Sequence, residues 1–140
     1  DEELFAHGNA DTIANPGAHM NSFDVNEKTG LISVGFRDLS QIYVIDKKSK
    51  LVIEKYGKSL FKYQHDSRFL ADEKIAVFNN NNIYENLNSQ SSVVIFDRKN
   101  KEIINWEFKC KFDSLSDGRS LKGGSVSELP NGNFLFFIGH

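Results

Sequence analysis

Cysteine, proline, methionine and tryptophan are scarce in this chain of 140 residues, which has one Cys, two Pro, one Met and one Trp. With Cys110 alone, no intramolecular disulfide can form and every Cys-rich zinc or iron–sulfur pattern is excluded. Long apolar runs are also lacking, since the longest, such as 134–138, fall far short of the roughly 20 residues of a membrane-spanning helix. We therefore expect no transmembrane segment and no metal site.

The N-terminus lacks the marks of a signal peptide, because it opens Asp-Glu-Glu instead of a basic flank followed by an apolar stretch. If the protein is exported, we expect its signal to have been removed. The first residue is not Met, which indicates a processed chain or an excised piece.

An excess of positive charge is absent as well. The chain has 17 Lys and Arg against 19 Asp and Glu, for a formal net charge of −2. Nucleic acid is therefore not an expected partner, because it is bound by domains with clustered Lys and Arg. With 39% hydrophobic residues, the chain is long enough to bury a core.

Short β-branched and aromatic segments separated by turn residues run through most of the sequence, and no segment has a sustained helical period. These patterns predict an all-β, antiparallel fold. The expected strands are 31–36, 41–45, 51–53, 74–78, 92–96, 102–108 and 133–138.

Two features repeat along the chain at roughly 40 to 50 residues, the length of a β-propeller blade. A hairpin with the turn Asp46-Lys-Lys-Ser-Lys50 recurs with the turn Asp97-Arg-Lys-Asn-Lys101. Before each hairpin stands a strand that begins at His19 or His65, and a third copy has Gly124 in place of the histidine.

These repeats predict four-stranded antiparallel blades at 19–56 and 64–108 and half a blade at 123–138, within one propeller segment over 1–140. About two and a half blades cannot close a ring, which needs at least ~4. Either the sequence is a fragment of a larger chain with further blades, or several copies self-assemble to complete the ring.

The first strand of each propeller blade lines the central channel, so matching positions of successive first strands converge on one site. His19 and His65 hold such a position, although a channel-facing histidine can also simply bond to nearby backbone. By strand alternation Asn21 points the same way as His19, and Gln64 and Asp66 flank His65. Asp66 either fixes the imidazole tautomer or satisfies backbone amides at a turn.

Arg37 directly follows a predicted strand. We expect it either to face the channel or to form an ion pair with Asp38 or Asp66.

The order of motifs from about residue 17 onward resembles that of arylsulfotransferase-like propellers. The matching motifs are His19-Met-Asn-Ser, Gly35-Phe-Arg37-Asp-Leu-Ser40, Gln64-His65-Asp66, Phe78-Asn79-Asn80 and Leu129-Pro-Asn-Gly-Asn133.

The resemblance implies a six-bladed propeller that moves a sulfuryl group from a phenolic sulfate ester to a phenol, without metal or nucleotide cofactor. It implies small phenolic or sulfated molecules as partners and a periplasmic or secreted location. His19 and His65 would be the catalytic residues that contact sulfate and phenol. The substrate-binding residues would be Asn21, Arg37, Gln64 and Asp66.

Two family features have no match here. No arginine follows the Phe78-Asn79-Asn80 motif before Arg98, and the place of the family's nucleophilic histidine reads Lys122-Gly-Gly-Ser. Two functions therefore stay open: an arylsulfotransferase, or a catalytically inactive propeller that binds a small ligand or a protein partner. A piece without independent activity is a third possibility.

Overall fold

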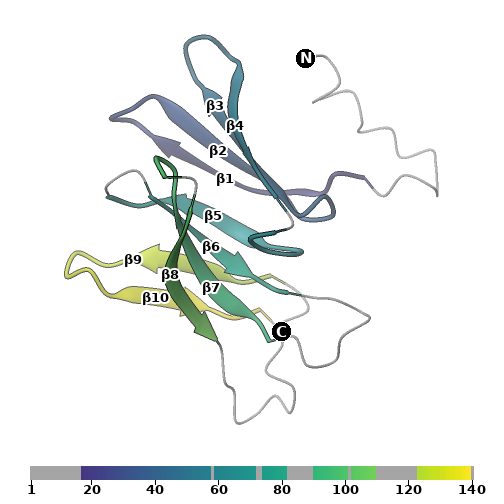
Figure 1. Cartoon of the computed structure of the whole chain (residues 1–140), viewed down its shortest axis with the longest axis vertical. Helices are drawn as coiled ribbons and strands as arrows, with labels where there is room; N and C mark the ends of the chain where they lie inside the picture. Colours follow the sequence, from purple (N-terminus) through teal and green to yellow (C-terminus); the bar gives the residue numbers. More distant parts are fainter. Residues whose placement is uncertain are drawn as a thin grey trace.

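The computed structural model describes residues 17–57, 59–71, 74–81, 90–100, 102–109 and 123–139, and for 102–109 it describes the backbone only. Within these ranges the chain forms ten strands in three antiparallel sheets and no α-helix (Figure 1). The all-β prediction is confirmed. In the same residues no helix has the length and apolar character to cross a membrane.

Strands that follow one another in the chain are neighbours in each sheet. The first sheet contains β1 (Met20–Asn26), β2 (Leu31–Phe36), β3 (Gln41–Asp46) and β4 (Val52–Tyr56). The second contains β5 (His65–Phe69), β6 (Lys74–Asn79), β7 (Ser92–Asp97) and β8 (Glu102–Lys109), and the third contains β9 (Ser125–Glu128) and β10 (Phe134–Phe137).

The repeated hairpin turns are built in the same way, by an aspartate that caps its own turn. Asp46 Oδ1 accepts a hydrogen bond from the Ser49 amide at 2.6 Å, and Asp97 Oδ1 accepts one from the Lys99 amide at 2.8 Å. The bond from the Ser49 amide lowers the pKa of Asp46. An aspartate favours such turns because its short side chain reaches backbone amides two or three residues ahead.

The three sheets lie in a row and pack through apolar faces (Figure 1). Between the first and second sheets, the rings of Tyr56 and Phe96 lie 4.5 Å apart beside Phe61. Between the second and third, Phe78 and Val126 are fully buried. Phenylalanine side chains thus fill much of the space between neighbouring sheets.

The described sheets do not close into a ring. Large apolar side chains stay exposed on the first and third sheets, at the two ends of the row, namely Met20, Phe23, Leu51, Ile53, Leu129, Leu135 and Phe137. The fold is that of a partial propeller. The blade boundaries and the further blades or copies that would complete the ring remain predictions.

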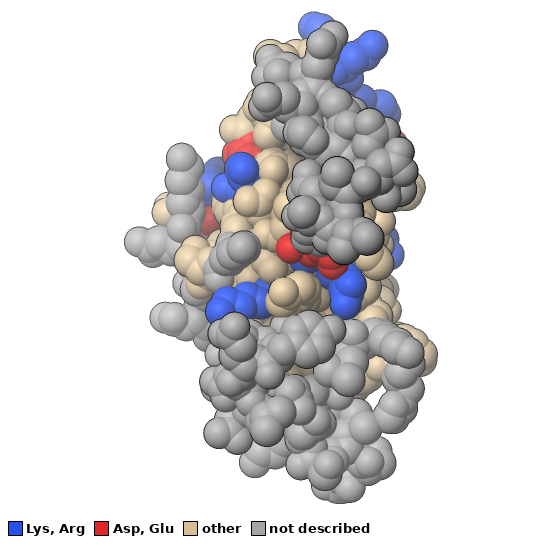
Figure 2. Space-filling model, turned by 90° about the vertical axis from the view of Figure 1, so that its right-hand side faces the viewer, with Lys and Arg blue, Asp and Glu red and all other residues tan. Residues whose placement is uncertain are grey.

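On the face drawn in Figure 2, charged side chains of both signs lie near one another among the described residues. An exposed pair joins Lys47 Nζ to Glu27 Oε2 at 3.3 Å, across the turns that end two hairpins.

Candidate functional site

His65 is the first residue of β5 and is half-buried. Its Nδ1 lies 2.7 Å from Asn80 Oδ1, just beyond the end of the neighbouring strand β6. Burial lowers the pKa of His65, and the charges of Arg37 and His19 lower it further, against the opposing effects of the hydrogen bonds to the Asn80 side chain and to the Tyr63 backbone. The neutral imidazole is therefore favoured near neutral pH.

His19 and Arg37 lie together where the first sheet begins. The Arg37 amide donates to the carbonyl oxygen of His19 at 3.0 Å, which joins the residue before β1 to the residue after β2. Asp38 lies between the two side chains, 3.0 Å from Arg37 Nη1 and 3.9 Å from His19 Nδ1. The predicted Arg37–Asp38 ion pair is confirmed, and Arg37 also lies over the ring of Tyr63 at 5.9 Å.

Arg37 and His19 are coupled electrostatically to His65, since both contribute to lowering its pKa. The side chain of His19 is 50% exposed and that of Arg37 is 23% exposed, so both are open to a solute. Imidazole and guanidinium groups can bind an anion, but Asp38 already pairs with Arg37 here, so an anion would have to compete with that carboxylate.

The strand register corrects the predicted equivalence of the two histidines. In β5, His65 pairs with Phe78 and Ser67 with Val77, so that Asp66 forms a bulge. In β1 it is Met20 that stands at the corresponding place, paired with Phe36, and Asn21 is the bulge. His19 precedes β1 by one residue, and its φ of 47° is left-handed.

The bulge also overturns the strand alternation expected between His19 and Asn21, because an extra residue in one strand breaks the period of two. Asn21 instead donates through Nδ2 to the Gln64 carbonyl oxygen at 2.7 Å. Its side chain therefore links the first sheet to the residue before β5.

Gln64 is completely buried, and its amide holds the turn between β2 and β3. Its Nε2 donates to the carbonyl oxygens of Phe36 at 3.1 Å and Gln41 at 2.8 Å. Gln64 Oε1 and Asn21 Oδ1 are buried oxygens without a hydrogen-bond partner among the described residues. Both are acceptors, so a donor group would satisfy them.

Asp66 satisfies backbone and arginine donors instead of contacting the neighbouring imidazole. Its Oδ2 accepts from the Val126 amide at 2.8 Å, and its Oδ1 accepts from Arg68 Nε at 2.7 Å. Of the two expectations for this residue, the structure shows the backbone-amide one. The partner of His65 is Asn80, whose contact sequence reasoning missed although the Phe78-Asn79-Asn80 motif was noted.

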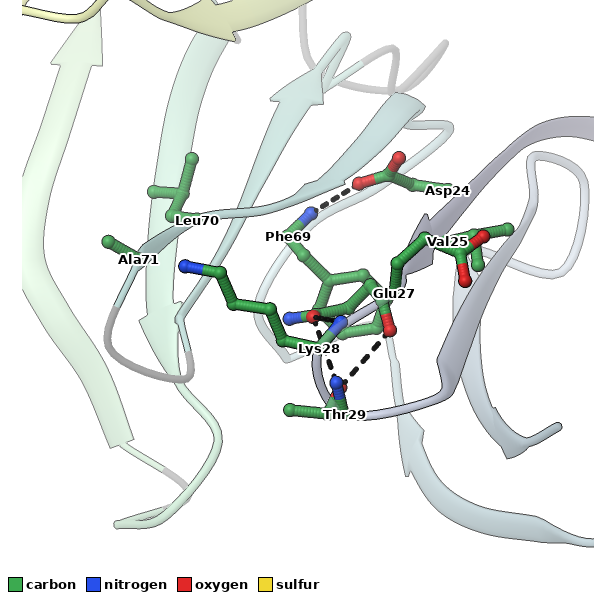
Figure 3. A pocket seen from close by; sticks show the side chains of 9 residues that line it. Asp24, Val25, Glu27, Lys28, Thr29, Phe69, Leu70 and Ala71 are labelled. Carbon is green, nitrogen blue, oxygen red and sulfur yellow. Dashed lines mark hydrogen bonds between the residues drawn. The ribbon is translucent and has the colours of Figure 1, made fainter. Parts of the chain in front are cut away.

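A surface hollow of about 710 Å³ lies at the opposite end of β1 and β5 from His19 and His65 (Figure 3). In it Asp24 Oδ2 accepts from the Phe69 amide at 2.8 Å, while Lys28 and Glu27 belong to the β1–β2 turn. None of the predicted site residues lines this hollow, so it is not part of the candidate site.

Cys110 and Lys122, both named in the sequence analysis, lie outside the described residues. Over the ranges that are described, no three His, Cys, Asp or Glu side chains gather as metal ligands would.

The fold defines a class of protein: a partial propeller, with two four-stranded antiparallel sheets and a two-stranded third sheet in the described residues. The family model for Arylsulfotransferase (ASST) matches residues 2–140, so the chain belongs to the arylsulfotransferase family. A search of curated proteins gave no match. The family resemblance predicted from the sequence motifs is confirmed. The function of the chain is arylsulfotransferase-like in general terms, with small aryl substrates.

Proposed function

We propose that this protein transfers a sulfuryl group from a phenolic sulfate ester to a phenol at the ends of β1 and β5. The bond between sulfur and the leaving phenol oxygen breaks, and a bond between sulfur and the acceptor phenol oxygen forms. The acceptor hydroxyl proton passes to His65 and then to the leaving phenolate, so that the products are a phenol and a new sulfate ester.

The observation that supports this proposal is the electrostatic coupling of His65, at the start of β5, to Arg37 and His19, which lie on either side of Asp38. A sulfate ester is an anion whose charge spreads over its sulfuryl oxygens. As in phosphoryl transfer, positioning and electrostatic stabilisation at those oxygens supply most of the catalysis. Arg37 provides a fixed positive charge and His19 a second hydrogen-bonding group.

His65 is suited to the proton transfer because burial and the nearby positive charges keep its imidazole neutral. A neutral imidazole has one nitrogen lone pair that can accept a phenol proton, and general base catalysis of this type gives about 10² to 10⁴-fold in rate. The imidazolium formed then returns that proton to the leaving oxygen.

A second function is supported by the third sheet. Where the family places its nucleophilic histidine, the chain has Gly123 and Gly124, and the Gly123 carbonyl oxygen already accepts from Asn80 Nδ2 at 2.8 Å. A propeller with that backbone in place of an imidazole would bind a sulfated or phenolic molecule without turning it over.

Release of coloured nitrophenolate from 4-nitrophenyl sulfate, with phenol as acceptor, separates the two functions. We expect turnover by the intact protein and a loss of at least about 10²-fold in His65→Ala. Arg37→Ala should raise KM, because it removes a charge that attracts the anion. Lys47→Ala is the control, since Lys47 lies in an exposed turn at the other end of β3 from Arg37 and should keep wild-type kinetics. Absence of turnover in the wild type, or unchanged turnover in His65→Ala, would contradict the enzyme proposal.

A further inference from the structure

The side-chain amide of Asn80 connects the His65 ring to the third sheet. Asn80 is 1% exposed, and its Oδ1 lies 2.7 Å from His65 Nδ1. Its Nδ2 donates to the Gly123 carbonyl oxygen at 2.8 Å, and its backbone oxygen accepts from Ser91 Oγ at 3.0 Å. Backbone and side chain are therefore both held.

These bonds allow only one orientation of the Asn80 amide. If the amide were rotated by half a turn, Oδ1 would face the Gly123 carbonyl oxygen, and two acceptors would be buried against each other. With Nδ2 facing Gly123, the atom that faces the imidazole is Oδ1, which can only accept. The His65 nitrogen opposite it must then donate.

We propose that Asn80 is a positioning residue that fixes the tautomer of His65, with the proton on Nδ1 and the lone pair on Nε2. One ring nitrogen of a neutral imidazole donates and the other accepts, and the partner of one nitrogen determines the state of the other. The inference deepens the proposed function and depends on it for the use of the Nε2 lone pair, which would take up the phenol proton.

The third sheet takes part through two glycines. Gly123 has a φ of +71° and Gly124 one of +138°, conformations that other residues rarely adopt. A Cβ at Gly124 would collide with the ring of Phe78, the residue that pairs with His65. The absence of side chains here permits the close approach by which the Gly123 carbonyl reaches Asn80.

Two-dimensional ¹H–¹⁵N spectra of the histidine rings test the tautomer directly on the full chain. His65 signals are assigned as those missing from His65→Gln, since the chain has four histidines. We expect a protonated Nδ1 and an unprotonated Nε2 at pH values above the pKa of His65. A proton on Nε2 in the wild-type protein would overturn the inference without use of any variant.

Two substitutions at the same position separate hydrogen bonding from folding. Asn80→Ala removes the acceptor, so the Nδ1–H form should give way to a mixture with Nε2–H. Asn80→Asp keeps an acceptor toward His65, so the tautomer should be retained and the new charge should raise the pKa of His65. Its second oxygen faces the Gly123 carbonyl oxygen, so this variant should also lose stability. If neither variant folds, the wild-type spectrum decides, because a proton on Nε2 there would refute the contact.

Asn79→Ala is a matched control. Asn79 is also buried and also uses both ends of its amide, accepting from the Lys62 amide at 2.9 Å and donating to Ser92 Oγ at 3.1 Å. Its loss should destabilise the protein and leave the His65 tautomer unchanged. A shift of tautomer in Asn79→Ala as large as that in Asn80→Ala would show a general structural effect and contradict the specific role.

Kinetics distinguish failure of this inference from failure of the proposed function. With turnover, Asn80→Ala should lower kcat about tenfold with little change in KM, and Asn80→Asp should move the acid limb of the pH–rate profile upward. Without turnover in the wild type, the proposed function fails, while the spectra still confirm or refute the tautomer.

Discussion

A buried ion pair between Arg98 and Glu54 joins the first and second sheets, and its removal should destabilise the protein strongly. The Arg98 side chain is 6% exposed and that of Glu54 is 24% exposed. Two bonds link them: Nε to Oε2 at 2.9 Å and Nη2 to Oε1 at 2.8 Å. Arg98 also lies over the ring of Phe69 at 5.6 Å, and Glu54 accepts from the Tyr56 hydroxyl at 2.8 Å.

We expect Arg98→Met to lower the free energy of unfolding by about 3 kcal/mol. Removal of one partner of a buried pair costs about 3 to 5 kcal/mol, because the remaining charge is left desolvated. The lower end applies here, since water reaches part of the Glu54 carboxylate. For a chain of this size the change corresponds to a decrease in Tm of roughly 10 °C.

Urea unfolding followed by circular dichroism measures the effect, and an unchanged m value would show that the unfolded state is not altered. Lys47→Met is the matched control, because the Lys47–Glu27 pair is exposed on both sides and should contribute less than about 1 kcal/mol. The double variant Glu54→Leu with Arg98→Met should recover much of the loss, because no charge is left buried. Equal losses in Arg98→Met and the Lys47 control would refute the assignment of this pair as the link between the sheets.

Three further predictions concern the site and its supports. The pKa of His65 lies below its ordinary value in the folded protein, so below about pH 6.5 the unfolded chain binds more protons than the folded one. The stability of the protein should therefore fall as the pH decreases through this range. His65→Gln should flatten this part of a plot of Tm against pH, and an unchanged slope in the variant would contradict the prediction. Gly124→Ala should cost about 2 to 3 kcal/mol in urea unfolding because its Cβ meets the ring of Phe78, whereas Gly17→Ala, with open space around it, should be neutral. Asp66→Asn should lower the free energy of unfolding by about 1 to 3 kcal/mol, since the Asn side chain has a single oxygen and cannot accept from both the Val126 amide and Arg68 Nε. Wild-type stability in this variant would contradict the importance of these two hydrogen bonds.

The strands and their antiparallel order could be predicted because they depend on local patterns. Alternating β-branched residues and a repeated aspartate turn predicted β3 and β7 and their hairpins, and the same aspartate caps both turns in the structure. The electrostatic coupling of His65 to His19 and Arg37 also has a sequence signal, since the three residues stand near the ends of successive predicted strands.

The equivalence predicted for the two histidines is wrong, because it rested on aligning the histidines and not on the strand register. In the register Met20, and not His19, is the paired residue before the bulge in β1, as His65 is in β5. The bulge itself has no sequence signal, since Asp66 is not a glycine yet has a φ of 49°. The contact between His65 and Asn80 depends on the same register, so it could not be predicted from the sequence either.

In the first and second sheets, polar side chains of the first strand accept hydrogen bonds from the unpaired backbone edge of the first strand in the following sheet. These bonds explain how β5 and β9, which have few apolar residues, are kept in place. β5 and β9 pair on one side only, so the outward amides of their other edge need acceptors. Ser22 Oγ accepts from the Ser67 amide at 3.3 Å, Asp24 Oδ2 from the Phe69 amide at 2.8 Å, and Asp66 Oδ2 from the Val126 amide at 2.8 Å.

The same arrangement has a consequence for the site. Side-chain oxygens can satisfy the unpaired backbone edge of β5 and β9 in place of another strand. Because no further strand of the described residues covers that edge, the residues at the strand ends stay accessible. His65 lies at the start of a strand whose edge is fixed at Ser67 and Phe69 by the preceding sheet and at the bulge by the following one. The position of His65 is therefore determined by three sheets together. Substitution of any of these carboxylate or hydroxyl acceptors should shift the position of the His65 ring, although none of them contacts it.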